Sequence, residues 1–449
     1  MTTRFVALFV TAATLIAGTP TTGTAQVVET RWTVEASIAR ALASHRPLEA
    51  TRAEAEAAAR GANAMSAERW PTLGLSAGGV YSDDPVAVFG TRLRQQRFTQ
   101  ADFDVAALND PDALGDWNAG LQARWSPLDF SRDAEIERSR ILARAAEAGA
   151  DRQAEVVVYR TRALHASAVM AEARLSAATS SLEAARATRD IVARRVDQGF
   201  LMERDLLRTE AALAGAIADS VRARASMEDT RDRLGLHLAL GPDTLAVPVT
   251  GPEGAVRIAL DDDAAAVRSD VEARRLTAEA ARAGVDAARR SRLPSIELTG
   301  AVTAHAASDF DATGVFGTMG LAVQVPLFTS GRIGYAVDRA DAMARAADLR
   351  NREAIATAEV ELREARRAVQ AAAAAVEAAT RGAEAAVEAR RLTRLRLDQG
   401  LATPDEALQA DAGAARSDAM RIDALINLEL GRAALDLARG GLPDIGDAR

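Results

Sequence analysis

The sequence predicts an α+β fold built mainly from long α-helices, in which one arrangement of elements occurs twice. A glycine-centred phrase, RRVDQGFLMERDLL at 194–207, returns 201 positions later as LRLDQGLATPDEAL at 395–408. The 449 residues include no lysine, 26% charged residues and only 4% aromatic residues, which is typical of long helices and not of a thick globular core. Short segments that alternate apolar and polar residues precede each long helical stretch, so strands accompany the helices.

The first residues are typical of a secretory signal peptide. Arg4 is followed by a mostly apolar stretch at 5–18 and by small residues just before Gln26. We therefore expect residues 1–25 to be a signal peptide. An N-terminal membrane anchor fits less well, because a spanning helix needs roughly 20 apolar residues.

The composition argues against several classes of function. Without cysteine, the chain has no disulfide, no thiolate metal site and no cysteine for acylation. A net charge of −8 disfavours nucleic acid as a partner. After Ala25 no apolar run is long enough for a transmembrane helix, so any membrane crossing would have to use strands in a closed barrel.

Further matches support the internal duplication. ERWPTLGLSAGGV at 68–80 parallels SRLPSIELTGAV at 291–302, and WSPLDFSR at 125–132 parallels QVPLFTSGR at 324–332. Each half is predicted to run helix, strand, strand, long helix, turn, helix, and a period of about 200 residues is too long for a solenoid unit. The expected parts are a first repeat at 26–249, a second repeat at 250–440 and a C-terminal tail at 441–449.

Two proline-free stretches, 132–198 and 332–399, are each predicted to form one helix of about 67 residues, or roughly 100 Å. A seam with a period of about 3.5 residues runs from Leu164 to Val196, and again in the same register 201 positions later. Its many alanines let helices approach closely, as in a wall of packed helices, although a plain coiled-coil core would give the same stripe. Shorter helices are predicted at about 47–69 and 203–238 in the first half, and at about 270–291 and 404–439 in the second. Placed end to end, the two short helices of each half come close to the length of one long helix.

Four segments of about ten residues are predicted to be strands. In the second of them, Trp117 and Leu121 share one face, while Gln122 and Arg124 share the other. One apolar and one polar face match strands that have lipid outside and water inside. A half-buried sheet of a soluble protein would alternate in the same way. The strands are expected at about 70–81, 116–128, 293–305 and 317–328.

Aromatic residues lie at or near the ends of these strands, as the girdle of a membrane-spanning sheet requires. Four strands cannot close a barrel alone, since the smallest spanning barrels have about eight strands, so several chains would share one barrel. The stretch 82–115 between the first two strands is long and polar, and its charges are predicted to form a solvated surface. The girdle candidates are Trp70, Tyr81, Trp117, Trp125 and Phe328.

With these features together, the chain resembles the TolC-type outer membrane efflux proteins, or outer membrane factors, over essentially its whole length after the signal. The resemblance is carried by PLDFSR at 127–132, VPLFTSGR at 325–332 and the two glycine turns. It implies a homotrimer whose α-helical barrel is joined to a 12-stranded transmembrane β-barrel, four strands from each chain. Such a protein lies in outer membrane lipid of a Gram-negative bacterium and extends into the periplasm.

The resemblance also implies roles for the two glycine turns. They would be the periplasmic hairpin tips, where glycine accepts the left-handed conformation that commonly ends a helix. In this family the tips meet a periplasmic adaptor, or membrane fusion protein; without the resemblance, the same residues are simply efficient turns. The expected adaptor contacts are Asp197, Gln198, Gly199 and Phe200, with Asp398, Gln399, Gly400 and Leu401.

The family narrows its tunnel with an acidic ring just after the second turn. The matching positions are Glu406 and Gln409, with Asp205 in the first half, and Gln409 departs from the acidic residue often found there. Three copies of Glu406 around an axis would attract cations. The alternative is an ordinary exposed glutamate, favoured by the dipole of the helix N-terminus.

The implied function is a passive exit duct of a tripartite efflux or export system, working with the adaptor and an inner-membrane pump such as an RND or ABC transporter. The sequence contains no metal-binding histidine pair, P-loop or nucleophile motif, so we expect no enzyme, no cofactor and no metal site. The alternative is a non-channel periplasmic coiled-coil scaffold or adaptor. The cargo is not indicated.

Overall fold

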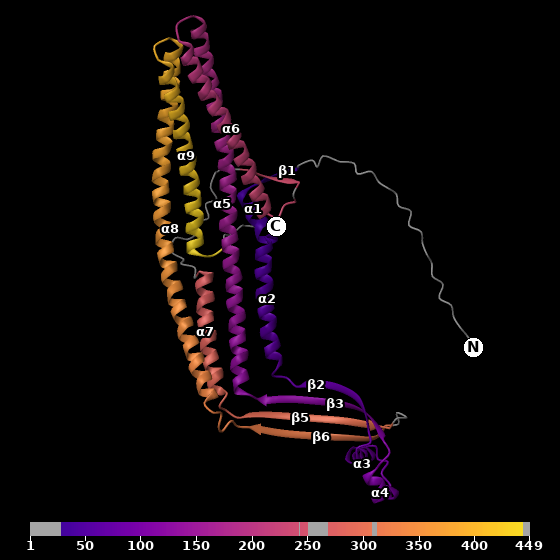
Figure 1. Ribbon diagram of the computed structural model, residues 1–449. Coiled ribbons are helices and arrows are strands. Elements are labelled where there is room, and N and C mark those ends of the chain that lie inside the picture. Colours follow the sequence, from indigo (N-terminus) through magenta and orange to yellow (C-terminus); the bar gives the residue numbers. More distant parts are fainter. Residues whose placement is uncertain (1–27, 242, 250–267, 308–311, 443–449) are drawn as a thin grey trace, which may run out of the picture.

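The computed structural model describes residues 28–241, 243–249, 268–307 and 312–442. Long helices run side by side in an elongated bundle, and a four-stranded sheet extends from one end of it (Figure 1). Two helical hairpin turns lie at the other end of the bundle. The expected signal peptide at 1–25 lies outside the described residues.

Two helices of unusual length organise the bundle. They are α5 (Phe130–Asp197), of 68 residues, and α8 (Arg332–Asp398), of 67 residues. Neither contains a proline, which would remove a backbone hydrogen bond and bend the helix. The Asp129 side chain starts α5 by accepting hydrogen bonds from the backbone N–H groups of Ser131 and Arg132.

Four shorter helices flank the long ones (Figure 1). α5 has α2 (Arg46–Ala67) and α6 (Glu203–His237) along its length, and α8 has α7 (Ser269–Arg290) and α9 (Pro404–Arg439). α5 also contacts α7 and α9, so it lies inside the bundle, whereas α8 contacts mainly α7 and α9. One side of α8 is therefore open in the single chain.

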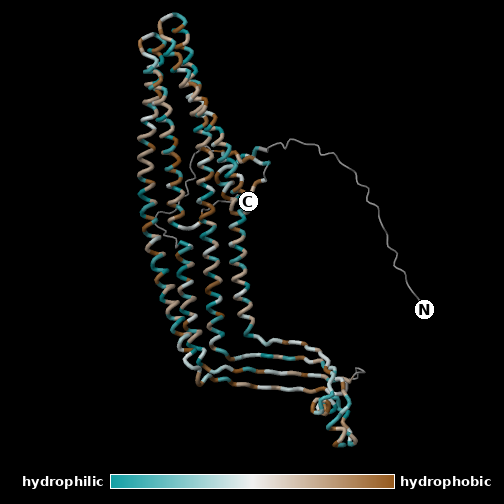
Figure 2. The backbone as a smooth tube through the Cα atoms, viewed as in Figure 1, coloured by the Kyte–Doolittle hydropathy of each residue, from teal (hydrophilic) through white to brown (hydrophobic). Residues whose placement is uncertain are grey.

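The alanine-rich seam faces the neighbouring helices. Ala168, Ala171 and Val192 of α5 are buried, as are Ala383 and Leu397 of α8. Hydrophilic and hydrophobic residues alternate along the helices (Figure 2), so each helix has a packed side and a polar side. Within the described part of the chain, no helix is both long enough and apolar enough to cross a membrane.

A small unit that the sequence analysis did not predict lies against α5 partway along the bundle. β1 (Val28–Trp32) leads into α1 (Val34–Ser44), which ends just before α2. β1 pairs in parallel with β4 (Thr244–Pro248), which follows α6. This pairing ties the beginning of the described chain to the end of its first half.

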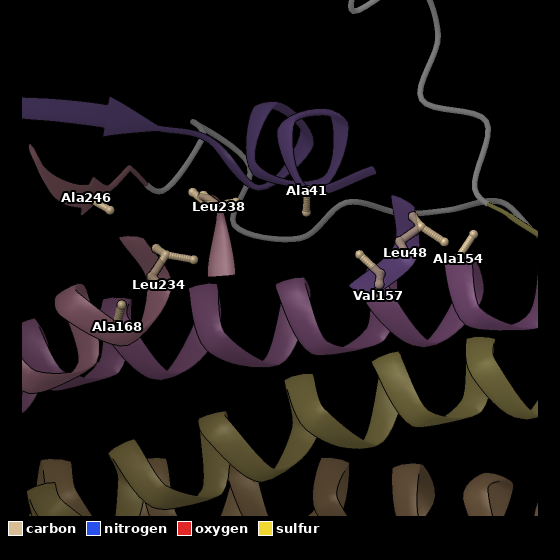
Figure 3. Close-up of a cluster of buried hydrophobic side chains, with 8 residues drawn as sticks. All are labelled: Ala41, Leu48, Ala154, Val157, Ala168, Leu234, Leu238 and Ala246. Carbon is tan, nitrogen blue, oxygen red and sulfur yellow. The ribbon is translucent and has the colours of Figure 1, made fainter. Parts of the chain in front are cut away.

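The core of this unit gathers side chains from five elements (Figure 3). Leu48, Leu234 and Leu238 are fully buried and pack with small residues of α1, α5 and β4. The side chain of Thr30 and the carbonyl of Leu245, which approach within 3.5 Å, are 215 positions apart. Two short strands so distant in sequence carry no local pattern that predicts their pairing.

The four longer strands form one antiparallel sheet in the order β2-β3-β5-β6. The last strand begins earlier than the predicted range 317–328 and ends at Gln324. It stops there because Pro326 has no backbone N–H to donate to the sheet. The strands are β2 (Thr72–Ser82), β3 (Leu114–Leu128), β5 (Ser295–Ala306) and β6 (Ala312–Gln324).

A folded unit, here called the cap (residues 83–113), connects β2 to β3 where the sequence analysis expected only a long polar loop. Phe98 packs against Phe89 and Phe103, with ring centroids 5.0 and 5.1 Å apart, so aromatic residues supply a small core. The cap contains α3 (Pro85–Arg94), the 3₁₀ helix η1 (Gln100–Phe103) and α4 (Val105–Asn109).

Candidate functional site

The strand register places the large apolar side chains of all four strands on one face of the sheet. Leu75 of β2 lies opposite Leu121 of β3, which lies opposite Val302 of β5. Most of these side chains are open to the surroundings: Leu75 is 81% exposed and Met319 is 93% exposed. The face comprises Leu73, Leu75, Tyr81, Trp117, Leu121, Trp125, Ile296, Leu298, Val302, Val315, Met319, Leu321 and Val323.

The opposite face carries mainly glycine, alanine, serine, threonine, asparagine and glutamine, with Val80, Leu114 and Phe316 as the larger apolar exceptions. In the described part of the sheet, charged or titratable groups on this polar face occur at its two ends only. Arg124 and Glu297 form an ion pair of 3.1 Å near the helices. At the far end, the Asp116 carboxylate lies 2.8 Å from the Nδ1 atom of His305. The middle of the polar face is therefore uncharged.

The sheet has two open edges. β2 pairs only with β3, and β6 pairs only with β5, among the strands of the described chain. Each edge strand therefore has one row of backbone N–H and C=O groups with no partner strand, which is a template for pairing with another strand.

The five aromatic residues expected to form a girdle lie at the two ends of the sheet. Tyr81 and Trp117 are at the end far from the helices. Trp125 is near the helices and donates a hydrogen bond of 2.9 Å from Nε1 to the carbonyl of Arg69. Trp70 precedes β2, and Phe328 lies beyond the end of β6 instead of within the predicted strand.

The two glycine turns lie close together at the end of the bundle opposite the sheet (Figure 1). Gly199 and Gly400 have φ angles of 76° and 78°, in the left-handed region that favours glycine. The next residue in each turn bonds back to the helix, Phe200 N to Arg195 O at 2.8 Å and Leu401 N to Arg396 O at 2.7 Å. Both turns therefore follow one hydrogen-bonding pattern.

The residues expected to contact an adaptor all lie in these two turns. Phe200 and Leu401 are 73% and 64% exposed, so each turn presents a large apolar side chain at its surface. Gln198 and Gln399 cap the ends of α5 and α8, directly after Asp197 and Asp398.

Contacts between the two hairpins were not foreseen from the sequence. Arg195 donates from Nη2 to the carbonyl oxygen of Asp398 at 2.7 Å. Arg208 of α6 donates from Nη1 to both carboxylate oxygens of Asp405 of α9, at 2.8 and 2.7 Å. These contacts link residues about half the chain apart, and no spacing rule identifies such partners. We refer to them as the hairpin links.

More contacts join α5 to α9 further along the bundle. The Asp411 carboxylate of α9 accepts a hydrogen bond of 2.9 Å from Thr188 of α5, and its other oxygen accepts one of 2.8 Å from Arg394 of α8. Two ion pairs follow, Arg174 with Asp423 and Arg162 with Asp436. The two hairpins are thus held together along α9.

The three residues expected at the aperture occupy different environments. Asp205 is only partly exposed, and it accepts a hydrogen bond of 3.2 Å from the backbone N–H of Met202, which caps α6. Glu406 and Gln409 are exposed on the first turns of α9. Within one chain, the described contacts do not bring these three residues together.

A model of the family "Outer membrane efflux protein" matches residues 37–241 and 260–441 of this sequence. The chain belongs to the outer membrane efflux protein family. This membership confirms the resemblance drawn from the sequence and favours an efflux duct over a periplasmic scaffold or adaptor. The family is one of efflux proteins and not of enzymes. No curated protein matches the sequence significantly.

Solved structures share the fold of this outer membrane efflux protein. CusC is 17% identical, with a TM-score of 0.78, and the match covers 91% of this chain and 92% of that one. The outer membrane protein VceC of Vibrio cholerae is 21% identical, with a TM-score of 0.74 over 91% of this chain and 96% of that one. The open-state MtrE outer membrane channel of Neisseria gonorrhoeae is 20% identical, with a TM-score of 0.74 over 98% of both chains.

Proposed function

We propose that three copies of this chain form a passive exit duct, in which a 12-stranded barrel crosses the outer membrane and a helical tunnel extends through the periplasm. The observation that carries the proposal is the exposed apolar face shared by all four strands, combined with the two open edges. In lipid, open edges leave backbone groups without partners, so a spanning sheet has to close. Pairing β6 of one copy with β2 of the next closes it.

The open side of α8 supports the same assembly. Tyr335 and Leu349 of α8 are exposed in the single chain, as are Ile217 and Val221 of α6. We place α8 of one copy against α6 of the next, which would cover these apolar side chains. The duplicated halves, 26–249 and 250–440 with the tail 441–449, would then give the tunnel wall a repeating structure.

The proposed partners are a periplasmic adaptor and an inner-membrane pump of the RND or ABC type. The adaptor would cover Phe200 and Leu401 at the hairpin tips, where an apolar side chain is otherwise open to water. The structurally similar MtrE is an outer membrane channel, which supports the same role for this chain. The duct itself would do no work, and the pump would supply the energy.

We propose that the aperture lies at the hairpin tips. Opening would separate the hairpins and break the hairpin links, in an iris-like movement favoured by contact with the adaptor. Glu406 would form the charged ring, with Gln409 one helical turn further along, while Asp205 would hold the start of α6 in place. Glu406 thus carries the charge selectivity in this proposal.

The experiment is membrane fractionation followed by reconstitution. The exported protein should appear in the outer membrane fraction, migrate as a heat-modifiable trimer and form ion-conducting channels in planar bilayers. A purified protein that stays monomeric and water-soluble without detergent would overturn the proposal, since its apolar sheet face would then need no lipid.

A further inference from the structure

The cap lies at the end of the sheet far from the helices (Figure 1), and its contacts there are with the polar face. Gly314 belongs to this face because it pairs with His305 across β5 and β6. A Cβ atom at Gly314 would come within 1.9 Å of the carbonyl oxygen of Arg94, the last residue of α3. The backbone of the cap is therefore in close contact with β6, and only glycine fits there.

One buried side chain ties the cap to the neighbouring strands. Gln95, directly after α3, is fully buried. Its Nε2 atom lies 2.8 Å from the carbonyl of Gly115, 3.2 Å from Oδ1 of Asp116 and 3.2 Å from the carbonyl of Ala306. Asp116 uses its other oxygen to hold His305, so Gln95 connects the cap to β3 and β5 together.

The cap has side-chain packing and contacts of its own. Besides the packing of Phe98 between Phe89 and Phe103, it contains an ion pair between Arg92 and Asp102. Asp102 also accepts a hydrogen bond of 2.7 Å from the backbone N–H of Thr99. The cap is therefore folded by its own contacts as well as by those with the sheet.

We propose that the cap narrows the outer mouth of the duct, excludes bulky hydrophilic solutes arriving from outside, and is positioned there by Gln95. This inference rests on the proposed function, in which the polar face lines the lumen. A unit seated on the polar face at its far end then occupies the lumen where the duct opens to the exterior. Gln95 is a positioning residue, because it contacts the strands and holds the cap in place but does not contact the solute.

The test uses cysteine labelling in whole cells, because the chain has no cysteine of its own. Thr318→Cys puts a thiol on the polar face in mid-strand, and Met319→Cys puts one on the apolar face next to it. A small charged maleimide added outside should label Thr318→Cys and not Met319→Cys. A maleimide carried on a bulky polymer should label Thr318→Cys only slowly. Because the maleimide reaches the lumen from outside the cell, the labelling rate does not depend on the periplasmic aperture.

Gln95→Ala should then raise the labelling rate of Thr318→Cys by the bulky reagent about tenfold, because a buried set of hydrogen bonds is lost. The rate with the small reagent should stay the same. Gln100→Ala, an exposed glutamine in the same cap, is the matched control and should change neither rate. Gly314→Ala disturbs the contact between the cap and β6 from the strand side, and it should raise the labelling rate by the bulky reagent in the same way. It is the second variant to use if Gln95→Ala trimers are unstable.

The outcomes separate the inference from the proposed function. If the bulky reagent labels the parent and both cap variants at one rate, the cap does not restrict the mouth. If Met319→Cys is labelled by the small reagent and Thr318→Cys is not, the assignment of the two faces fails, and the proposed barrel fails with it.

Discussion

At the scale of single residues, two histidines from different parts of the chain are in contact. His237, at the end of α6, and His45, between α1 and α2, have ring centroids 4.7 Å apart. The Nε2 atom of His237 lies 2.9 Å from the hydroxyl of Thr161, which itself donates to the carbonyl of Val157. Burial, with a smaller effect from the charge of His45, lowers the pKa of His237 from 6.5 to about 4.

This lowered pKa predicts a loss of stability in acid. Between about pH 6.5 and pH 4 the unfolded chain binds a proton at His237 that the folded chain does not, so stability is full above this window and falls as the pH drops through it. The full shift corresponds to roughly 3 kcal/mol, and because His237 is only partly buried, solvent screening should reduce the loss to about 2 kcal/mol. Thermal melts of the detergent-solubilised protein across this range would show it, and His237→Gln should flatten the pH profile. An identical profile for that variant would contradict the assignment.

The two tip glycines predict unequal effects of one substitution. Alanine at either Gly199 or Gly400 costs about 1 kcal/mol, because both have left-handed backbones. At Gly400 the added Cβ would also come within 2.7 Å of Arg195 Nη1 and displace the link to Asp398, whereas at Gly199 it meets nothing within 4 Å. Gly400→Ala should therefore raise single-channel conductance more than Gly199→Ala. Equal conductances would show that the link does not restrain the aperture.

At the scale of helices, α6 and α9 are joined at the tips by Arg208 and Asp405. Both side chains are more than half exposed, so the pair contributes only roughly 0.2–1 kcal/mol. Arg208→Ala should raise the fraction of time that the channel is open about twofold. The exchange Arg208→Asp with Asp405→Arg should restore the parent value in planar bilayers. If the exchange behaves like the single change, the effect does not come from the ion pair.

At the scale of the whole molecule, the charge selectivity of the aperture depends on three copies of Glu406 meeting near one axis. Glu406→Gln should lower the ratio of cation to anion permeability about twofold or more, measured as a reversal potential in a salt gradient. Glu203→Gln is the matched control, since Glu203 is also an exposed glutamate in the first turn of its helix. If both variants shift the potential equally, Glu406 is an ordinary helix-start glutamate.

The local sequence determined the helices, the turns and the two-faced strands of this protein. Leu164 and the seam after it, Gly199, Gly400 and the alternation around Leu121 each follow from rules that act over a few residues, where periodicity and backbone preference decide the structure. The family resemblance rested on the same local phrases.

Only the tertiary structure decided which distant groups meet. Thr30 lies beside Leu245, Arg208 pairs with Asp405, and Gln95 enters the sheet beside Asp116 and Ala306. Such contacts depend on the relative placement of the long helices and strands. The residues next to each contact in the sequence do not predict that placement. The register of the sheet is the main example. Alternation gave each strand two faces, but only the pairing of the strands put every apolar face on the same side.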